Sequence, residues 1–284
     1  MSLLNLKNLF YLLKIRHWIK NLSIFLPIFV AQAFNEKIIN EYIVHLLIFS
    51  IASSVVYLIN NTHDYEKDII NKKLKYQIDT SKKNVNYFLG FFITLILLFF
   101  ISYYEKDIII IIVGYLLLSL LYNFIFKKIK YVDIFFLTTF HLLRIYYGSV
   151  AFNIEISIYF LAFCLSVFLM IGSNKRLYEI NNRYTNRPYK IEDKNKIEFL
   201  QILFGGFSIL SFIFYILASE NAKLFHSQYF LLLNLILLVF IILNFLYFQR
   251  KKEQDVIEFI YKNKINFVLV GLFLFLFNFN SNFS

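Results

Sequence analysis

The 284-residue chain is 59% hydrophobic and 20% aromatic, and only 17% of its residues are charged, against about a quarter in soluble domains. Its 7 glycines and 2 prolines are too few for a loop-rich or all-β protein, and its single cysteine excludes an intramolecular disulfide. The net charge of +11 would suit a nucleic-acid partner only if it were gathered on one water-facing fold; it is instead divided among segments between apolar stretches, which argues against nucleic acid.

About nine apolar stretches recur along the chain, most of them near the roughly 17–25 residues that a helix needs to cross the hydrocarbon core. Membrane β-strands would alternate in polarity, whereas runs such as 91–101 and 231–243 are continuously apolar. The sequence therefore predicts an all-α integral membrane protein, with a single polytopic domain over residues 1–284. In chain order, the predicted membrane helices cover residues 19–34, 41–60, 85–104, 108–126, 132–152, 156–174, 198–218, 229–248 and 265–280.

The segments that connect these helices alternate sharply in charge. All but four of the 29 Lys and Arg residues fall in the N-terminal segment and in the second, fourth, sixth and eighth connections. The exceptions are Lys37, Lys106 and Lys223 in the other connections, and Arg144 inside a predicted helix. Because Lys and Arg are retained on the cytoplasmic side, the N-terminus is predicted in the cytoplasm and the C-terminus outside.

The end of the second predicted helix carries unusual polar chemistry. If the helix continues, Asn60, Asp64 and Asp68 fall at i, i+4 and i+8 and share one face, with Asn61 at its edge. Carboxylate and amide oxygens at a membrane surface suit Mg²⁺, which takes a few carboxylates together with substrate phosphates and water. In the alternative interpretation, Asp64 and Asp68 merely balance nearby lysines at a solvated helix end. The spacing alone favours neither.

The same segment resembles the Asn-Asp-x-x-Asp-x-x-x-Asp signature of the UbiA-type membrane prenyltransferase superfamily. Asn61 stands where the signature usually has its first Asp, and the other three polar positions match. Nine helices with long cytoplasmic loops after the second and sixth also resemble that fold, so the similarity covers essentially the whole chain. The resemblance implies a UbiA-like bundle in which Asn60, Asp64 and Asp68 bind Mg²⁺ and act in catalysis.

Two further segments resemble the polyprenyl-phosphate phosphoribosyltransferase branch of this superfamily. Residues 14–21, Lys-Ile-Arg-His-Trp-Ile-Lys-Asn, are similar to its Arg-Pro-Arg-Gln-Trp-Val-Lys-Asn stretch. Residues 122–127, Tyr-Asn-Phe-Ile-Phe-Lys, are similar to its Tyr-Ser-x-x-Leu-Lys, which has an Asp downstream. The matching positions are Arg16, Trp18, Lys20, Asn21, Tyr122, Lys127 and Asp133.

The connection after the sixth helix points to the same branch. Other members usually carry a second aspartate-rich motif there, whereas this chain has Lys175-Arg176-x-Tyr178-Glu179, similar to the branch's Lys-Arg-Tyr-Ala-Glu. Lys175 and Arg176 are residue types that meet phosphate directly as charge-assisted donors; the alternative is that they only set topology. The branch's Arg-Pro pair after the acidic motif is missing here.

Arg144 is an independent indication of a buried site. It lies about eleven residues past Asp133, hence roughly 16 Å along a helix, and a charge at that depth usually faces a cavity or a partner. The branch shows an Arg at a similar place, followed by a Gly like Gly148. The alternative is a structural Arg that joins helices through backbone carbonyls or Glu155. His141, three residues earlier, is interpreted as a buried hydrogen-bonding group.

The resemblance implies Mg²⁺-dependent transfer of 5-phosphoribosyl from phosphoribosyl diphosphate to a polyprenyl phosphate, in cell envelope polysaccharide biosynthesis. The site would face the cytoplasm from a bacterial inner membrane. Residues assigned to substrate binding are Arg16, Lys20, Asn61, Tyr122, Lys127, Arg144, Lys175, Arg176 and Tyr178. Three alternatives stay open: an aromatic or quinone-type prenyltransferase that uses a prenyl diphosphate, a transferase that uses another activated sugar, and a non-enzymatic transporter.

Overall fold

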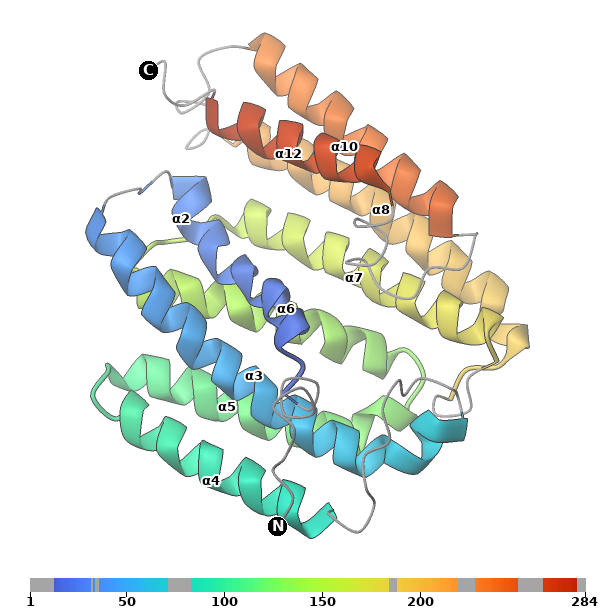
Figure 1. Cartoon of the computed structure of the whole chain (residues 1–284). Coiled ribbons are helices and arrows are strands. Elements are labelled where there is room, and N and C mark those ends of the chain that lie inside the picture. Colours follow the sequence, from blue (N-terminus) through green and yellow to red (C-terminus); the bar gives the residue numbers. More distant parts are fainter. Residues whose placement is uncertain are drawn as a thin grey trace. The chain divides into compact units, whose positions relative to one another are not determined.

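The computed structural model describes residues 13–31, 33, 36–70, 83–183, 188–218, 228–249 and 263–279. Within these ranges the regular structure is helical throughout (Figure 1), as the sequence predicted. The elements are η1 (Ile15–Phe25), α2 (Leu26–Ala31), α3 (Glu36–Ile70), α4 (Lys83–Ile101), α5 (Lys106–Phe124), η3 (Phe126–Lys128), α6 (Val132–Ala151), α7 (Ile158–Asn181), η4 (Ile191–Asp193), α8 (Lys194–Leu217), α10 (Gln228–Gln249) and α12 (Lys264–Phe279).

Six of the described helices are long and apolar enough to cross a membrane: Asn40–Asp64, Asn84–Ile101, Lys106–Lys128, Val132–Ala151, Ile158–Asn181 and Ile191–Leu217. Leu232–Tyr247 and Lys264–Phe277 are apolar but shorter. The first predicted membrane helix is instead a 3-10 helix of 11 residues followed by a short α-helix. Nine spans, and the sides on which the termini lie, stay predictions.

The surface of these helices is strongly apolar. Phe88, Phe91 and Phe99 on α4 and Phe214 on α8 are each more than half exposed. Contiguous apolar surface of this kind is an aggregation liability in water, whereas lipid solvates it. Helices also satisfy their backbone hydrogen bonds internally, as the bilayer core requires. The chain is therefore a multi-pass membrane protein.

The chain divides into two compact units, each of which has its own packed interior. The first combines Met1–Ile129 with Leu143–Ile154, and the second combines Lys130–Leu142 with Glu155–Ser284. In the first unit, α3 packs along α4 and against η1. In the second, α7 packs along α8, over a cluster of buried side chains formed by Ile134, Leu169, Leu177, Ile180, Tyr189 and Ile197.

Within the first unit, Gly148 of α6 allows η1 to approach very closely. A Cβ atom added at Gly148 would lie 2.1 Å from the carbonyl oxygen of Ile24 and 3.0 Å from its carbonyl carbon. Ile24 is fully buried, and a backbone atom cannot rotate away as a flexible side chain can. Glycine inside a helix costs roughly 0.5–1 kcal/mol of stability relative to alanine. Gly148 is explained by packing, because a side chain at this position would collide with the backbone of Ile24.

We expect Gly148→Ala to destabilise the protein by about 2–3 kcal/mol, since η1 would have to move away from α6. Gly114→Ala in α5 is the matched control, because a Cβ atom there meets nothing within 4 Å. That control should be neutral or stabilising by up to about 1 kcal/mol. Thermal unfolding of the two purified variants in detergent measures the difference, and equal melting temperatures would contradict the close packing.

Candidate active site

The acidic segment lies on one uninterrupted helix. Because α3 continues to Ile70, Asn60, Asp64 and Asp68 do share one face, one turn apart. Asn61 and Asp64 are buried, and Asn60 is half-buried. The side chain of Asp68 lies outside the part of the chain that the structure describes.

Asp64 forms a buried ion pair with a residue from another predicted motif. The Nζ atom of Lys127, in η3, donates a hydrogen bond of 2.6 Å to Oδ1 of Asp64, and both side chains are almost fully buried. Tyr122, from the same motif, is buried in the last turn of α5. Two segments that the sequence singled out separately therefore meet in the first unit, and they bring a carboxylate and an ammonium group together.

The N-terminal motif is tied to the same helix, about three turns before Asp64. The indole Nε1 of Trp18 donates to Ser54 Oγ at 2.8 Å. The Nδ2 atom of Asn21 donates to Ser50 Oγ at 3.0 Å and to Ser53 Oγ at 3.1 Å. These bonds fix η1 along α3. Of the two basic residues assigned to substrate in this motif, Arg16 is exposed and Lys20 is half-buried.

Arg144 joins this network from α6. Its Nε atom donates to Oδ1 of Asn21 at 2.8 Å, and its guanidinium carbon lies 5.5 Å from the ring centroid of Phe49 and 5.7 Å from that of Tyr115. Arg144 is buried, as its depth in the helix predicted. In the second unit, His141 is half-buried and its ring stacks on Phe168 at 4.5 Å between centroids.

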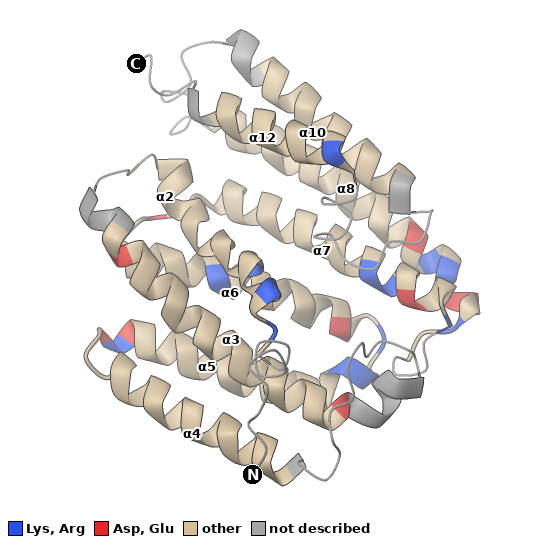
Figure 2. Ribbon diagram, in the orientation of Figure 1, with Lys and Arg blue, Asp and Glu red and all other residues tan. Residues whose placement is uncertain are grey.

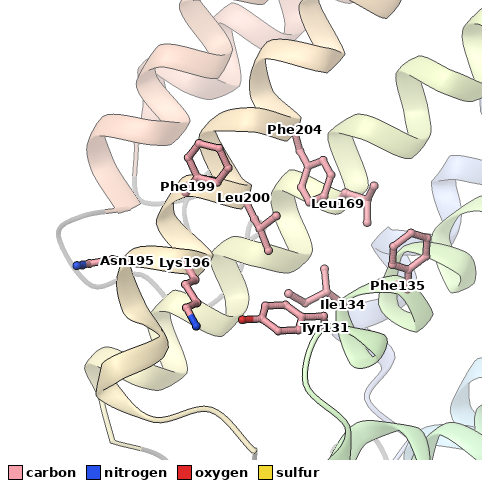
Figure 3. Close-up of a pocket in the computed structure, with 9 residues that line it drawn as sticks. All are labelled: Tyr131, Ile134, Phe135, Leu169, Asn195, Lys196, Phe199, Leu200 and Phe204. Carbon is pink, nitrogen blue, oxygen red and sulfur yellow. The ribbon is translucent and has the colours of Figure 1, made fainter.

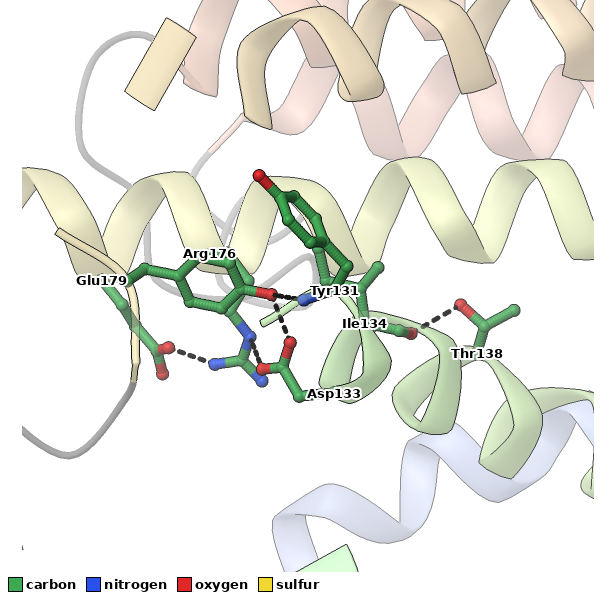
Figure 4. Close-up of polar contacts among 7 residues, drawn as sticks. Tyr131, Asp133, Ile134, Thr138, Arg176 and Glu179 are labelled. Carbon is green, nitrogen blue, oxygen red and sulfur yellow. Dashed lines mark hydrogen bonds and ion pairs between the residues drawn. The ribbon is translucent and has the colours of Figure 1, made fainter. Parts of the chain in front are cut away.

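The second unit holds a buried charge cluster around Arg176 (Figure 4). Arg176 has no exposed surface, and its Nε atom lies 2.6 Å from Asp133 Oδ2 in an ion pair. Its Nη1 atom donates a short hydrogen bond to Oε2 of Glu179, three residues later on α7. The sequence assigned Arg176 to direct phosphate contact. In the structure its guanidinium pairs with two carboxylates, those of Asp133 and Glu179, which are buried beside it.

Tyr189 completes this cluster and was missed by the sequence analysis. Its hydroxyl donates a short hydrogen bond to Oδ1 of Asp133 and accepts one of 2.7 Å from the backbone N–H of Tyr131. Burial, with the neighbouring Asp133 carboxylate, raises the pKa of Tyr189 well above its usual range, so the hydroxyl stays protonated and remains a donor. Nothing in the sequence marks Tyr189 among the 21 tyrosines.

The two other residues assigned to substrate on α7, Lys175 and Tyr178, are half-buried on the turns around Arg176. Figure 2 shows that Lys, Arg, Asp and Glu gather where α7 ends and where α8 begins. Charged residues of α7 and α8 therefore concentrate where α7 ends and α8 begins, while the middle of each of these helices is apolar.

The donor atoms on α3 fit a magnesium ion that phosphates also ligate. Among the described side chains, no three His, Cys, Asp or Glu residues come together as a metal-binding group. Magnesium needs only one or two protein carboxylates when substrate phosphates and water supply the other positions. Asp64 and Asn60, with Asp68 on the same helix face, are the residues that would hold such an ion jointly with the substrate, and Oδ1 of Asp64 pairs with Lys127 in this structure.

Comparison with known proteins finds relatives in sequence and in fold. No family model matches the sequence. The chain is 28% identical to decaprenyl-phosphate phosphoribosyltransferase of Corynebacterium glutamicum over 59% of its own length and 53% of that protein. It is 22% identical to the nodulation protein NoeC of Azorhizobium caulinodans over 73% of the chain and 71% of that protein. An uncharacterized protein of Sinorhizobium fredii is 25% identical over 64% of the chain and 36% of that protein. The aligned region thus spans only about a third to a half of two of these relatives.

The solved structures match over almost the entire chain. A UbiA homolog from Archaeoglobus fulgidus, bound to DMAPP and Mg²⁺, superposes with a TM-score of 0.71 at 10% identity, over 95% of this chain and 97% of that one. A digeranylgeranylglyceryl phosphate synthase superposes with a TM-score of 0.60 at 16% identity, over 97% and 98%. The resemblance predicted from the sequence motifs is thereby confirmed, and the chain has the fold of the UbiA-type prenyltransferases.

Proposed function

We propose that the chain transfers the 5-phosphoribosyl group of phosphoribosyl diphosphate to a polyprenyl phosphate and releases diphosphate, with Mg²⁺ as cofactor. The observation that carries the proposal is the buried contact between Asp64 and Lys127, which joins the acidic motif to a second motif of the phosphoribosyltransferase branch. The similarity to decaprenyl-phosphate phosphoribosyltransferase supports the same reaction. The Mg²⁺ bound to a UbiA homolog with this fold supports the cofactor.

The proposed chemistry is a substitution at the anomeric carbon of ribose. The bond from this carbon to the diphosphate oxygen breaks, and a bond to an oxygen of the lipid phosphate forms. The lipid phosphate already carries negative charge, so the reaction needs no general base, and catalysis consists of positioning and charge stabilisation. When Mg²⁺ is bound, it neutralises negative charge on the departing diphosphate.

The residues of the chain take the following parts in this proposal. Asp64, Asn60 and Asp68 would hold the ion, and Asn61 lies beside them on α3. Lys127, whose buried ammonium group pairs with Asp64 in this structure, would offer a positive charge to a substrate phosphate, since a buried ammonium group needs an anionic partner. Six further residues are assigned to binding the phosphates or the ribose of the substrates: Arg16, Lys20, Tyr122, Arg144, Lys175 and Tyr178.

Arg176 has a different part from the one that its motif implied. Because two carboxylates hold its guanidinium, we assign it to positioning α7 against the start of α6 rather than to contact with phosphate. The site is proposed to face the cytoplasm of a bacterial inner membrane, where a water-soluble diphosphate donor and the basic connections of the chain are both found.

The direct test uses the purified full-length protein in lipid nanodiscs with Mg²⁺, phosphoribosyl diphosphate and a polyprenyl phosphate. We expect a lipid-linked phosphoribose by mass spectrometry, formed in equal amount with diphosphate and lost when EDTA is added. A UbiA homolog with this fold binds DMAPP, so a parallel reaction supplies a prenyl diphosphate and an aromatic acceptor. A prenylated aromatic product without any lipid-linked phosphoribose would overturn the proposal.

A further inference from the structure

A groove of about 550 Å³ opens on the second unit, beside the first turns of α8. Its size falls within the range of about 300–1,000 Å³ that is typical of ligand sites. Figure 3 shows that aromatic rings surround it. Its lining residues include Tyr131, Phe135, Leu169, Lys196, Phe199 and Phe204.

The groove is lined almost entirely by apolar groups, and the polar residues of its lining lie at one end, in the first turn of α8. Asn195 and Lys196 lie in the first turn of this helix, whereas Phe199, Leu200 and Phe204 follow in the next turns. The candidate membrane span that contains α8 begins at Ile191, so the polar end lies close to one end of the span. Eight residues of helix place Phe204 about 12 Å deeper than Lys196. An amphiphile with a charged head and an apolar chain has this same order.

At the polar end, two lysines have acidic partners, and the charge of Lys196 acts on Asp193 without a close ion pair. Lys130 Nζ lies 2.7 Å from Asp193 Oδ2, and Lys194 pairs more loosely with Glu198 at 3.9 Å. Lys196 has no ion-pair partner among the described residues, and its side chain is exposed. A lysine in this position extends its apolar stem along the groove and keeps its ammonium group at the interface.

The opposite wall of the groove is held by the buried charge cluster. Tyr131 has a φ of 65°, a left-handed conformation that is rare for an aromatic residue. Its backbone N–H is fixed by Tyr189, which in turn bonds Asp133 beside Arg176. Strained residues of this kind persist where the surroundings hold them, and they cluster at ligand sites. The neighbouring Lys130–Asp193 pair fastens this wall to the residue that precedes α8.

We infer that this groove binds the lipid acceptor, with its isoprenoid chain along Phe135, Phe199 and Phe204 and its phosphate beside Lys196. The inference rests on the proposed function, which it deepens by assigning the acceptor a place. Arg176, Asp133 and Tyr189 then act as positioning residues, because they hold Tyr131 in the wall. In the sequence, Tyr131 lies only four positions after Lys127, the residue that pairs with Asp64.

Binding is tested without any phosphoribosyl donor, on the full-length protein in nanodiscs, with a polyprenyl phosphate that carries a diazirine on its chain. Mass spectrometry should locate the cross-link in 131–135 or 199–204. Lys196→Gln should weaken binding by about threefold to fivefold, the upper part of the range of an exposed ion pair, while Lys194→Gln should change it less than twofold. Phe199→Ala should weaken binding as well, whereas Phe207→Ala, exposed on the same helix outside the groove, should not.

Two further probes separate the head group and the kind of lipid. The corresponding polyprenol, which lacks the phosphate, should bind more weakly and should be insensitive to Lys196→Gln. Phosphatidylglycerol should not displace the polyprenyl phosphate at equal concentration. Displacement by phosphatidylglycerol, labelling elsewhere, or unchanged binding in the groove variants would overturn the assignment. Specific groove binding without any lipid-linked phosphoribose in the activity assay would instead overturn the proposed function alone.

Discussion

Asp64→Asn is expected to reduce phosphoribosyl transfer by at least about a thousandfold, because it removes the described carboxylate that would hold the metal ion. The same change leaves Lys127 buried without its anionic partner, and breaking a buried ion pair in this way costs about 3–5 kcal/mol. Loss of activity and loss of stability are therefore expected together. Product formation and thermal unfolding of the purified variant measure them separately.

A second variant separates the catalytic role of Asp64 from its structural role. Asp64→Asn combined with Lys127→Met removes both buried charges, so stability should return close to that of the wild type while transfer stays absent. Asp64→Glu, which keeps the carboxylate, should recover part of the activity at a raised Mg²⁺ concentration. Asp68→Asn should show the same loss of Mg²⁺-dependent transfer. Full activity in both Asp64→Asn and Asp68→Asn would show that α3 does not hold the metal ion.

Arg176→Met is expected to destabilise the protein by about 3–5 kcal/mol, since it leaves Asp133 and Glu179 buried without a counter-charge. Arg183→Met is the matched control, because Arg183 is exposed just after α7; it should change the free energy of unfolding by less than about 0.5 kcal/mol. Thermal unfolding in detergent reports both values. Arg176→Lys should fall between them, because one ammonium group cannot replace the two-sided contacts of the guanidinium.

The same variants decide between the two interpretations of Arg176. If its guanidinium contacted the substrate directly, Arg176→Met would raise the KM for phosphoribosyl diphosphate and leave unfolding unchanged. The buried cluster predicts instead that Arg176→Met lowers the melting temperature. Any change in the kinetics would then follow from this loss of stability. An unchanged melting temperature of Arg176→Met would therefore support direct contact between Arg176 and the substrate.

The helical architecture and the acidic face were predictable because both depend on local periodicity. Residues four apart on a helix share a face whatever surrounds them, so Asn60, Asp64 and Asp68 could be grouped from spacing alone. The first membrane helix was predicted less well. Apolar content suggested one helix over residues 19–34, but the structure changes from 3-10 to α geometry just before Pro27, which has no N–H and suits the first turn of an α-helix.

The contacts of the site could not be predicted, because they join residues far apart in the chain. Lys127 and Asp64 were each singled out, yet nothing in their local spacing paired them across 63 positions. The assignment of Arg176 to phosphate stays a prediction that the motif alone could not refine, because a guanidinium suits phosphate and carboxylate equally well. Only the burial of Asp133 and Glu179 beside it distinguishes the two cases. Tyr189 belongs to no motif and required the structure.

The contrast between the two buried arginines has an electrostatic consequence. Arg144 contacts the neutral side chains of Asn21, Phe49 and Tyr115. Arg176 instead pairs with two carboxylates, those of Asp133 and Glu179. In a medium of low dielectric constant the field of a charge reaches further than in water. The two carboxylates therefore offset the charge of the Arg176 guanidinium, whereas the contacts of Arg144 with Asn21, Phe49 and Tyr115 leave its charge in place.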